Sequence, residues 1–277
     1  MFGKLIKYEM KSMLKVFSIA WGAILVVALI SGLSMTNDIF VISANDTAVN
    51  SMSGQIAGMV EMISTMLYIG LAVALVALTM VFVISRFGKG LLGDEGYLMF
   101  TLPTTPRKLI TAKGVSATII MIISAVVGAL SMVVFILPST EGVELKAMFS
   151  FISEAVSRYP QAIPMVIEGI VLAILAAVNF IYHIYASIAI GHLSSKHRVL
   201  FSVIAFIGIS VVFEILAGLA VTVLREFEWL ENILNNTVND LQGVTIVFGM
   251  VCLAEIAGIV IFHIITEYIL NKKLNLL

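Results

Sequence analysis

The 277-residue chain is poor in charged residues, which make up only 12% of it, whereas apolar residues make up 60%. An ordinary soluble domain is about 25% charged and roughly 45–50% apolar. A soluble protein of this composition could not cover its own surface with polar groups, whereas lipid can replace water as the outer solvent. The chain also has a single cysteine, Cys252, so it can form no disulfide within itself.

Motifs for nucleotide hydrolysis and for metal chemistry are missing as well. Neither Gly-x-x-x-x-Gly-Lys-Ser/Thr nor His-Glu-x-x-His occurs. The glycine-rich stretch 88–93 lacks the Lys-Ser/Thr ending and a preceding strand, so it is not a phosphate-binding loop. The longest polar stretches run about 20–30 residues, too short for a hydrophobic core of their own. We therefore expect no soluble domain, no cofactor or metal, and no hydrolysis of ATP by this chain alone.

Six continuous apolar runs are long enough to cross a membrane as helices, which takes about 20 residues. A β-barrel would instead show segments of alternating apolar and polar residues. The first run is longer than the core of a cleaved signal peptide, so we expect it to be retained. The chain is therefore predicted to be an all-α polytopic membrane protein, with residues 1–277 forming a single transmembrane domain. The expected spans are about 16–34, 57–84, 115–137, 164–190, 199–224 and 243–268.

The basic residues are distributed unequally between the two sides of the membrane. Only Lys146, Arg158 and Arg225 among the 16 Lys and Arg residues fall on one side of the predicted topology. All the others lie at the termini or in the second and fourth loops. Because Lys and Arg accumulate in cytoplasmic loops, we expect a multi-pass protein of the cell membrane with both termini in the cytoplasm.

The amino-terminal segment has basic and apolar residues on different faces. Lys4, Lys7, Lys11 and Lys15 fall at helical spacing, and Leu, Ile and Met residues occupy the other face. This pattern predicts a basic amphipathic helix that lies in the inner membrane interface. The alternative is a charge-biased flank that only sets the topology.

The second loop, between spans two and three, carries an unusual apolar segment. Asp94 can cap a short helix that Pro103 ends. Exposed apolar groups between charged flanks require either a protein partner or the membrane surface, and we favour the partner. The large apolar residues of this segment are Tyr97, Leu98, Phe100 and Leu102.

Four carboxylates lie well within the predicted spans, where a charged acid costs roughly 2.5–3.5 kcal/mol, whereas Glu267 lies at the inner edge of the last span and can reach water. They are Glu61, Glu168, Glu214 and Glu255. Two interpretations stay open: a polar substrate path or proton relay, and hydrogen bonds between helices that fix their packing. We expect His183 and His263 to be packed rather than to bind metal, and the pair Ala254 and Gly258 to allow a close helix contact.

The sequence resembles the ABC-2 type permeases, the membrane subunits of bacterial ABC exporters. The resemblance rests on residues 93–104 and 109–114, which match the segment after the second span in that family, and on residues 2–9. It implies an exporter of a peptide-, drug- or lipid-like substrate, with a separate cytoplasmic ABC ATPase and a second or sister permease as partners. Membrane lipid surrounds such a protein, and nucleic acid is not a partner. The residues that the resemblance assigns to the ATPase-coupling helix are Asp94, Glu95, Tyr97, Leu98, Phe100 and Leu102.

Two other functional classes compete with this interpretation. A proton-coupled secondary transporter could use Glu214 and Glu255 as its relay and would work without an ATPase. Internal repeats would favour that class, but the two halves show no convincing repeat. An intramembrane enzyme would need paired catalytic groups at one depth, and no such motif is present. Nothing in the sequence selects a substrate.

Overall fold

The computed structural model describes residues 2–35, 52–93, 105–140, 162–194, 196–225 and 241–272, with scattered residues between 147 and 158. This described part of the chain forms helices and contains no strand, which confirms the all-α prediction. Six helices in it are long and apolar enough to cross a membrane. They are α1 (Phe2–Met35), α2 (Met52–Leu92), α4 (Pro106–Ile136), α6 (Ala162–Gly191), α7 (Arg198–Arg225) and α9 (Leu241–Lys272). A 3₁₀ turn, Leu137–Thr140, follows α4.

Three of the helices, α1, α2 and α4, extend well beyond the predicted spans, and α4 begins at Pro106 rather than near residue 115. α1 begins at Phe2, so the predicted amphipathic helix is helical but is continuous with the first span rather than separate from it. Residues 2–35 contain no proline that would interrupt the helix. α2 has 41 residues and is roughly 60 Å long at 1.5 Å per residue. It therefore exceeds the hydrocarbon core of about 30 Å and must tilt or extend beyond it.

Large apolar side chains cover the outside of the helices. Ile19, Val73 and Leu253 are each more than 60% exposed. In α7 the most apolar stretch contains no buried residue at all. Such a surface would be insoluble in water but is the expected surface against lipid or against another membrane protein.

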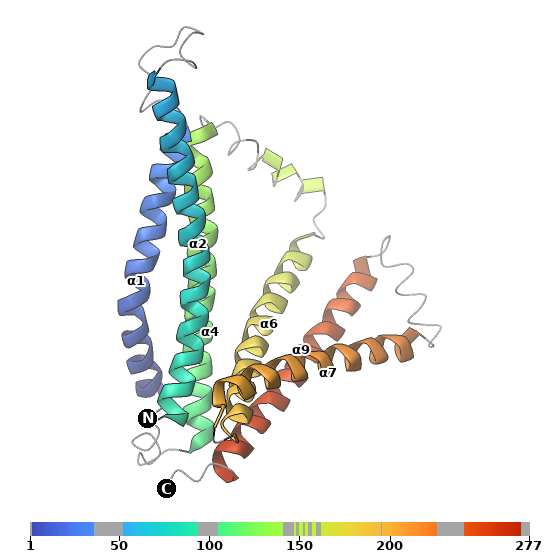
Figure 1. The fold of residues 1–277 in the computed structure, drawn as a ribbon. Coiled ribbons are helices and arrows are strands. Elements are labelled where there is room, and N and C mark those ends of the chain that lie inside the picture. Colours follow the sequence, from blue (N-terminus) through green and yellow to red (C-terminus); the bar gives the residue numbers. More distant parts are fainter. Residues whose placement is uncertain are drawn as a thin grey trace. The chain divides into compact units, whose positions relative to one another are not determined.

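The chain divides into two compact units, which we name by their principal helices (Figure 1). The α1–α2–α4 unit comprises residues 7–81 and 119–159. The α6–α7–α9 unit comprises residues 1–6, 82–118 and 160–277, and so includes the end of α2 and the start of α4.

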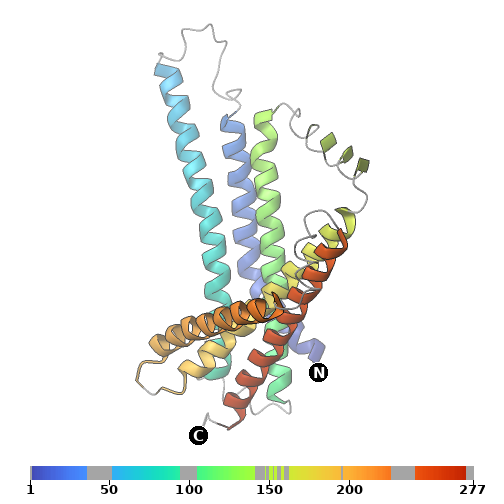
Figure 2. The same ribbon diagram turned by 90° about the vertical axis from the view of Figure 1, so that its right-hand side faces the viewer.

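Polar contacts cross the interior of the α1–α2–α4 unit, whose three long helices lie side by side (Figure 2). Trp21 Nε1 in α1 donates to Ser124 Oγ in α4 at 3.1 Å. Tyr68 in α2 stacks on Phe135 in α4, with ring centroids 4.7 Å apart. Its hydroxyl lies 3.2 Å from Ser131 Oγ. These contacts satisfy polar groups that would be costly if left unpaired in the membrane.

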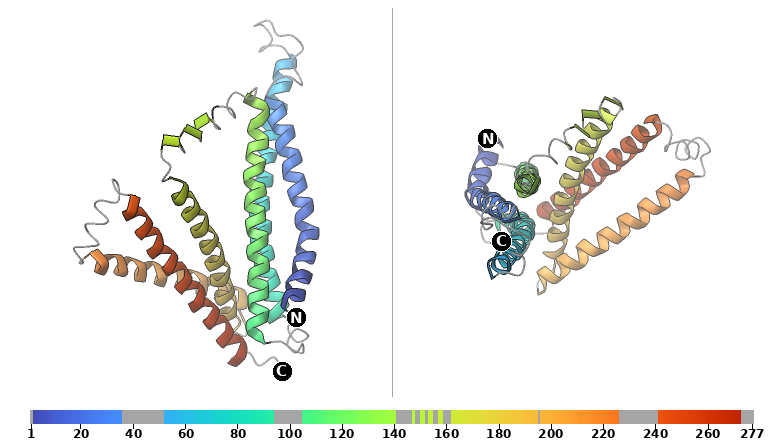
Figure 3. Two further views of the ribbon diagram at one scale, coloured as in Figure 1. Left: turned by 180° about the vertical axis from the view of Figure 1, so that it is seen from behind. Right: turned by 90° about the horizontal axis from the view of Figure 1, so that it is seen from above.

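In the α6–α7–α9 unit, α6 packs against both α7 and α9. Both neighbours are inclined to α6 rather than parallel to it (Figure 3). At the turn between α6 and α7, a Cβ on Gly191 would lie 1.9 Å from Ser202 Oγ, so only glycine fits there. The ends of α2, α6 and α9 and the starts of α4 and α7 meet at one end of this unit, which we call its basic end. The basic residues at this end are Arg86, Lys89, Arg107, Lys108, Lys113, Lys196, Arg198 and Lys272.

Candidate functional site

The predicted ATPase-coupling segment lies outside the described residues, but both of its flanks are described. Asp94, Glu95, Tyr97, Leu98, Phe100 and Leu102 all belong to the stretch 94–104 that the structure does not describe. α2 ends at Leu92 on one side of this stretch, and α4 begins at Pro106 on the other. The structure therefore describes the residues on either side of this segment, at the end of α2 and the start of α4.

Both flanks are buried in the core of the basic end. Leu91 in α2 and Leu109 and Ile110 in α4 have no exposed surface. Phe87, one turn before Leu91, stacks on Tyr185 of α6 with ring centroids 4.0 Å apart. Burial of each side chain of this size away from water stabilises the fold by roughly 1.5–3 kcal/mol. The two flanks are therefore held firmly against α6.

Tyr182 of α6 connects α4 with α9. Its hydroxyl is hydrogen-bonded to the Thr111 side chain of α4. Its ring meets the imidazole of His263 in α9 edge to face, with centroids 5.4 Å apart. A Cβ on Gly114 would lie 2.8 Å from the Tyr182 hydroxyl oxygen, so glycine leaves room for the end of the Tyr182 side chain against α4. His263 is thus packed, as predicted.

An ion pair adds a second connection between α4 and α9. Arg107 Nε donates to Glu267 Oε1 at 2.5 Å, and the two side chains are 73% and 15% exposed. Deeper in the same end, Lys113 is only 2% exposed. Its ammonium lies against Gly90, where a Cβ would be 2.8 Å from Nζ. The two flanks of residues 94–104 thus reach α6 and α9 through ring contacts, a hydrogen bond and an ion pair.

The four intramembrane acids have different surroundings. Glu255 is partly buried and accepts a hydrogen bond from Asn179 Nδ2 at 2.5 Å. Glu168 is partly buried, and its Oε2 has no hydrogen-bond partner among the described residues. Glu61 is also partly buried, whereas Glu214 is exposed on α7. Only Glu255 therefore combines a described partner with a cavity.

That cavity, the Glu255 cavity, has a volume of about 260 Å³ and lies between α6, α7 and α9. Asn179, Ser210 and Glu255 each lie close to the middle of their helices, so the polar part of the cavity is deep in the spans. Glu214 does not line it. The lining residues are Ala176, Asn179, Phe180, His183, Ser210, Phe213, Glu255 and Phe262.

The imidazole of His183 is fixed between two phenylalanine rings. Its centroid lies 4.3 Å from that of Phe206 in α7 and 4.9 Å from that of Phe262 in α9, and both pairs are stacked. The prediction of a packed histidine agrees with this arrangement. Sequence reasoning missed Asn179, although an amide in the middle of a span, four residues before His183, was a usable signal.

Gly258 is the small residue that makes room for the polar pair. It is buried one turn after Glu255, and a Cβ there would lie 2.9 Å from Asn179 Nδ2. The predicted close contact at the pair Ala254 and Gly258 is therefore present at Gly258, and what it accommodates is a side-chain amide rather than another helix backbone.

A second cavity lies within the α1–α2–α4 unit and is mainly apolar. Its volume is about 280 Å³, and its lining includes the flexible side chains of Met80, Met121 and Met132. The hydroxyls of Tyr68 and Ser131 border it. Gly128 also lines it, and a Cβ there would meet no atom within 4 Å.

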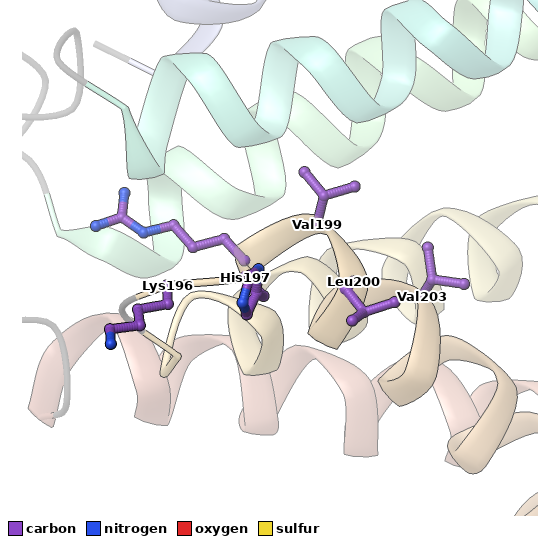
Figure 4. A pocket seen from close by; sticks show the side chains of 6 residues that line it. Lys196, His197, Val199, Leu200 and Val203 are labelled. Carbon is purple, nitrogen blue, oxygen red and sulfur yellow. The ribbon is translucent and has the colours of Figure 1, made fainter.

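A shallow hollow is present at the turn between α6 and α7 (Figure 4). Its lining joins basic residues of the turn to exposed apolar residues at the start of α7, such as Val199 and Leu200. This combination suits the level of lipid headgroups, where basic side chains lie beside apolar ones.

Comparison of the chain with protein-family models, with curated proteins and with solved structures gave no match. The class that the fold itself defines is a multi-pass helical membrane protein with six candidate spans.

Proposed function

We propose that the chain is the permease subunit of an ATP-driven ABC exporter of the cell membrane, with both termini in the cytoplasm. The segment 94–102 would contact a separate cytoplasmic ATPase. The observation that carries this proposal is the way in which both flanks of that segment are tied into the basic end.

The connections at the basic end give a physical path from the coupling segment to the spans. A displacement of residues 94–102 would act on Phe87 and on the start of α4. From there it would pass to α6 through Tyr185 and Tyr182, and to α9 through Glu267. α6 and α9 hold the Glu255 cavity, so closure of the ATPase would reach a polar site in the membrane. Packed interiors transmit such displacements because they do not deform freely.

The surface of α7 supports an assembly with a second permease. Glu214 is exposed near the middle of this helix, where an uncovered charged acid is costly. The most apolar stretch of α7 contains no buried residue, so its apolar side chains are also uncovered. A second copy or a sister chain would cover this surface and give Glu214 a polar neighbour.

The direct test is co-purification of the chain with an ABC ATPase, sought first among the products of the neighbouring reading frames. The double variant Tyr97→Ala with Phe100→Ala should lose the ATPase during purification while still inserting into the membrane. The matched control is Leu200→Ala with Phe201→Ala, which removes two exposed apolar groups from the start of α7. Retention of the ATPase by the first double variant, at the level of the control, would contradict the coupling role.

The proton-coupled secondary transporter remains the alternative. The hydrogen bond between Glu255 and Asn179 in a membrane cavity favours a role for Glu255. The relay from Glu214 has less support, because Glu214 does not line that cavity. This alternative expects transport that continues without an ATPase and that stops when the proton gradient is collapsed.

A further inference from the structure

The Glu255 cavity contains a buried hydrogen-bond acceptor that has no donor among the described residues. Asn179 directs its amide nitrogen at Glu255, which leaves the buried Asn179 Oδ1 without a partner among the described residues. His183 also lines the cavity and is hydrogen-bonded to the backbone of Phe206. No Lys or Arg is among the described residues that line the cavity. A carboxylate and an amide oxygen therefore lie together with no cation beside them, an arrangement that is costly inside a membrane.

The remaining walls of the cavity are aromatic. Phe180, Phe213 and Phe262 come from three different helices and line the same space. Phe262 is held in place by its stacking on His183. The faces of such rings attract cations, most strongly where water is excluded. Aromatic side chains next to a carboxylate and an amide oxygen are suited to a cation that carries both an apolar group and N–H donors.

Two simpler occupants fit the cavity less well. A proton on Glu255 would remove the charge, but it would give no role to the three phenylalanine side chains that line the cavity. A metal ion usually requires several protein ligands, and the described residues contain no group of three His, Cys, Asp or Glu side chains. The volume of about 260 Å³ is that of roughly nine water molecules at ~30 Å³ each, which suits a small organic molecule.

We propose that the Glu255 cavity binds a small organic ammonium ion that carries an aromatic or apolar group. The N–H groups of the ligand donate to Glu255 and to Asn179 Oδ1, and its apolar part lies against Phe180, Phe213 and Phe262. That this ion is the cargo rests on the proposed transport function, whereas the binding site itself rests on the cavity alone.

The test is equilibrium binding to the purified full-length chain in lipid nanodiscs, without any ATPase. The probe is benzylammonium at neutral pH, compared with benzyl alcohol, which has a similar shape but no charge. Benzylammonium should bind more tightly than the alcohol. Glu255→Gln should weaken benzylammonium binding roughly 10- to 150-fold, because it removes a charge-assisted hydrogen bond. The matched control Glu214→Gln, an acid outside the cavity, should leave binding unchanged.

A second variant guards against a folding defect. Phe213→Leu keeps both acceptors and exchanges one apolar side chain for another. It should weaken binding of benzyltrimethylammonium, which has no N–H donor, by about 2- to 30-fold through the lost ring. All variants must elute as the wild-type species on size exclusion before they are compared.

The outcomes separate this proposal from the proposed function. Equal affinity for benzylammonium and benzyl alcohol, or the same benzylammonium affinity in Glu255→Gln as in the wild type, would overturn the ammonium site and leave a proton as the occupant of Glu255. No measurable binding of benzylammonium would also overturn it. Binding as predicted, in a chain that does not associate with an ATPase, would support the site and count against the exporter. Association with the ATPase without benzylammonium binding would support the exporter and overturn the ammonium site.

Discussion

Replacement of Gly258 by alanine tests the packing on which the Glu255 cavity depends. A Cβ at this position would lie 2.9 Å from Asn179 Nδ2 and 3.0 Å from Asn179 Oδ1, closer than atoms in van der Waals contact. The Asn179 side chain would have to move, and its hydrogen bond to Glu255 would be lost or distorted. The wild-type protein is therefore predicted to be more stable than the Gly258→Ala variant, although alanine is intrinsically the better helix former.

The magnitude follows from two opposing effects. Alanine gains about 1 kcal/mol over glycine in a helix interior. Loss of a hydrogen bond to a charged group costs about 1.5–3 kcal/mol. The net loss in free energy of unfolding is therefore about 0.5–2 kcal/mol. Gly70→Ala is the matched control, because Gly70 lies within α2 and a Cβ there meets no atom within 4 Å. It should be neutral or stabilising by up to about 1 kcal/mol.

The assay is reversible unfolding of the purified chain in mixed micelles with increasing SDS, followed by tryptophan fluorescence. A double-mutant cycle isolates the cause. With Asn179 replaced by alanine, the clash disappears, and Gly258→Ala should no longer destabilise. If Gly258→Ala stabilises the wild type as much as Gly70→Ala does, the reasoning on this contact is wrong.

Three further changes probe the rest of the structure by the same unfolding assay. Tyr68→Phe should cost about 0.5–1.5 kcal/mol through one lost hydrogen bond, and no loss would show that this bond is not formed. Tyr185→Ala removes a side chain with no exposed surface and should cost about 3–5 kcal/mol, whereas Val199→Ala at a site 79% exposed should change stability by under about 0.5 kcal/mol. Arg107→Ala should cost less than about 1 kcal/mol, because Arg107 is largely exposed; a loss above 3 kcal/mol, abolished when Glu267 is also replaced by Gln, would mean that the pair behaves as a buried one.

Much of the fold could be predicted from the sequence, because lipid imposes a simple length rule on apolar helices. The six spans were found where the apolar runs lie, and the differences concern helix ends. The continuation of Phe2–Lys15 into the first span was missed, because an amphipathic pattern shows a helix but not where the chain bends. The predicted second span, residues 57–84, is already longer than the hydrocarbon core requires, and α2 exceeds it at both ends.

The candidate site was only partly predictable. The single-residue cost of an acid in a span pointed to Glu255, and the small-residue spacing pointed to Gly258. The partner Asn179 and the three phenylalanines come from different helices, and only the crossing of α6 with α7 and α9 brings them together. Periodicity within one helix carries no information on such crossings. The sequence therefore could not distinguish Glu255, which lines the cavity, from Glu214, which does not.

The central claim is that the segment 94–102 contacts a cytoplasmic ATPase, and site-specific photo-crosslinking tests it most directly. A photoreactive phenylalanine analogue would be placed at position 97 and, as the control, at Leu200, in cells that express the chain together with the ABC ATPase identified by co-purification. We expect a crosslinked adduct with the ATPase at position 97 and none at position 200. Absence of any adduct at position 97, with the chain inserted and the ATPase present, would contradict the account.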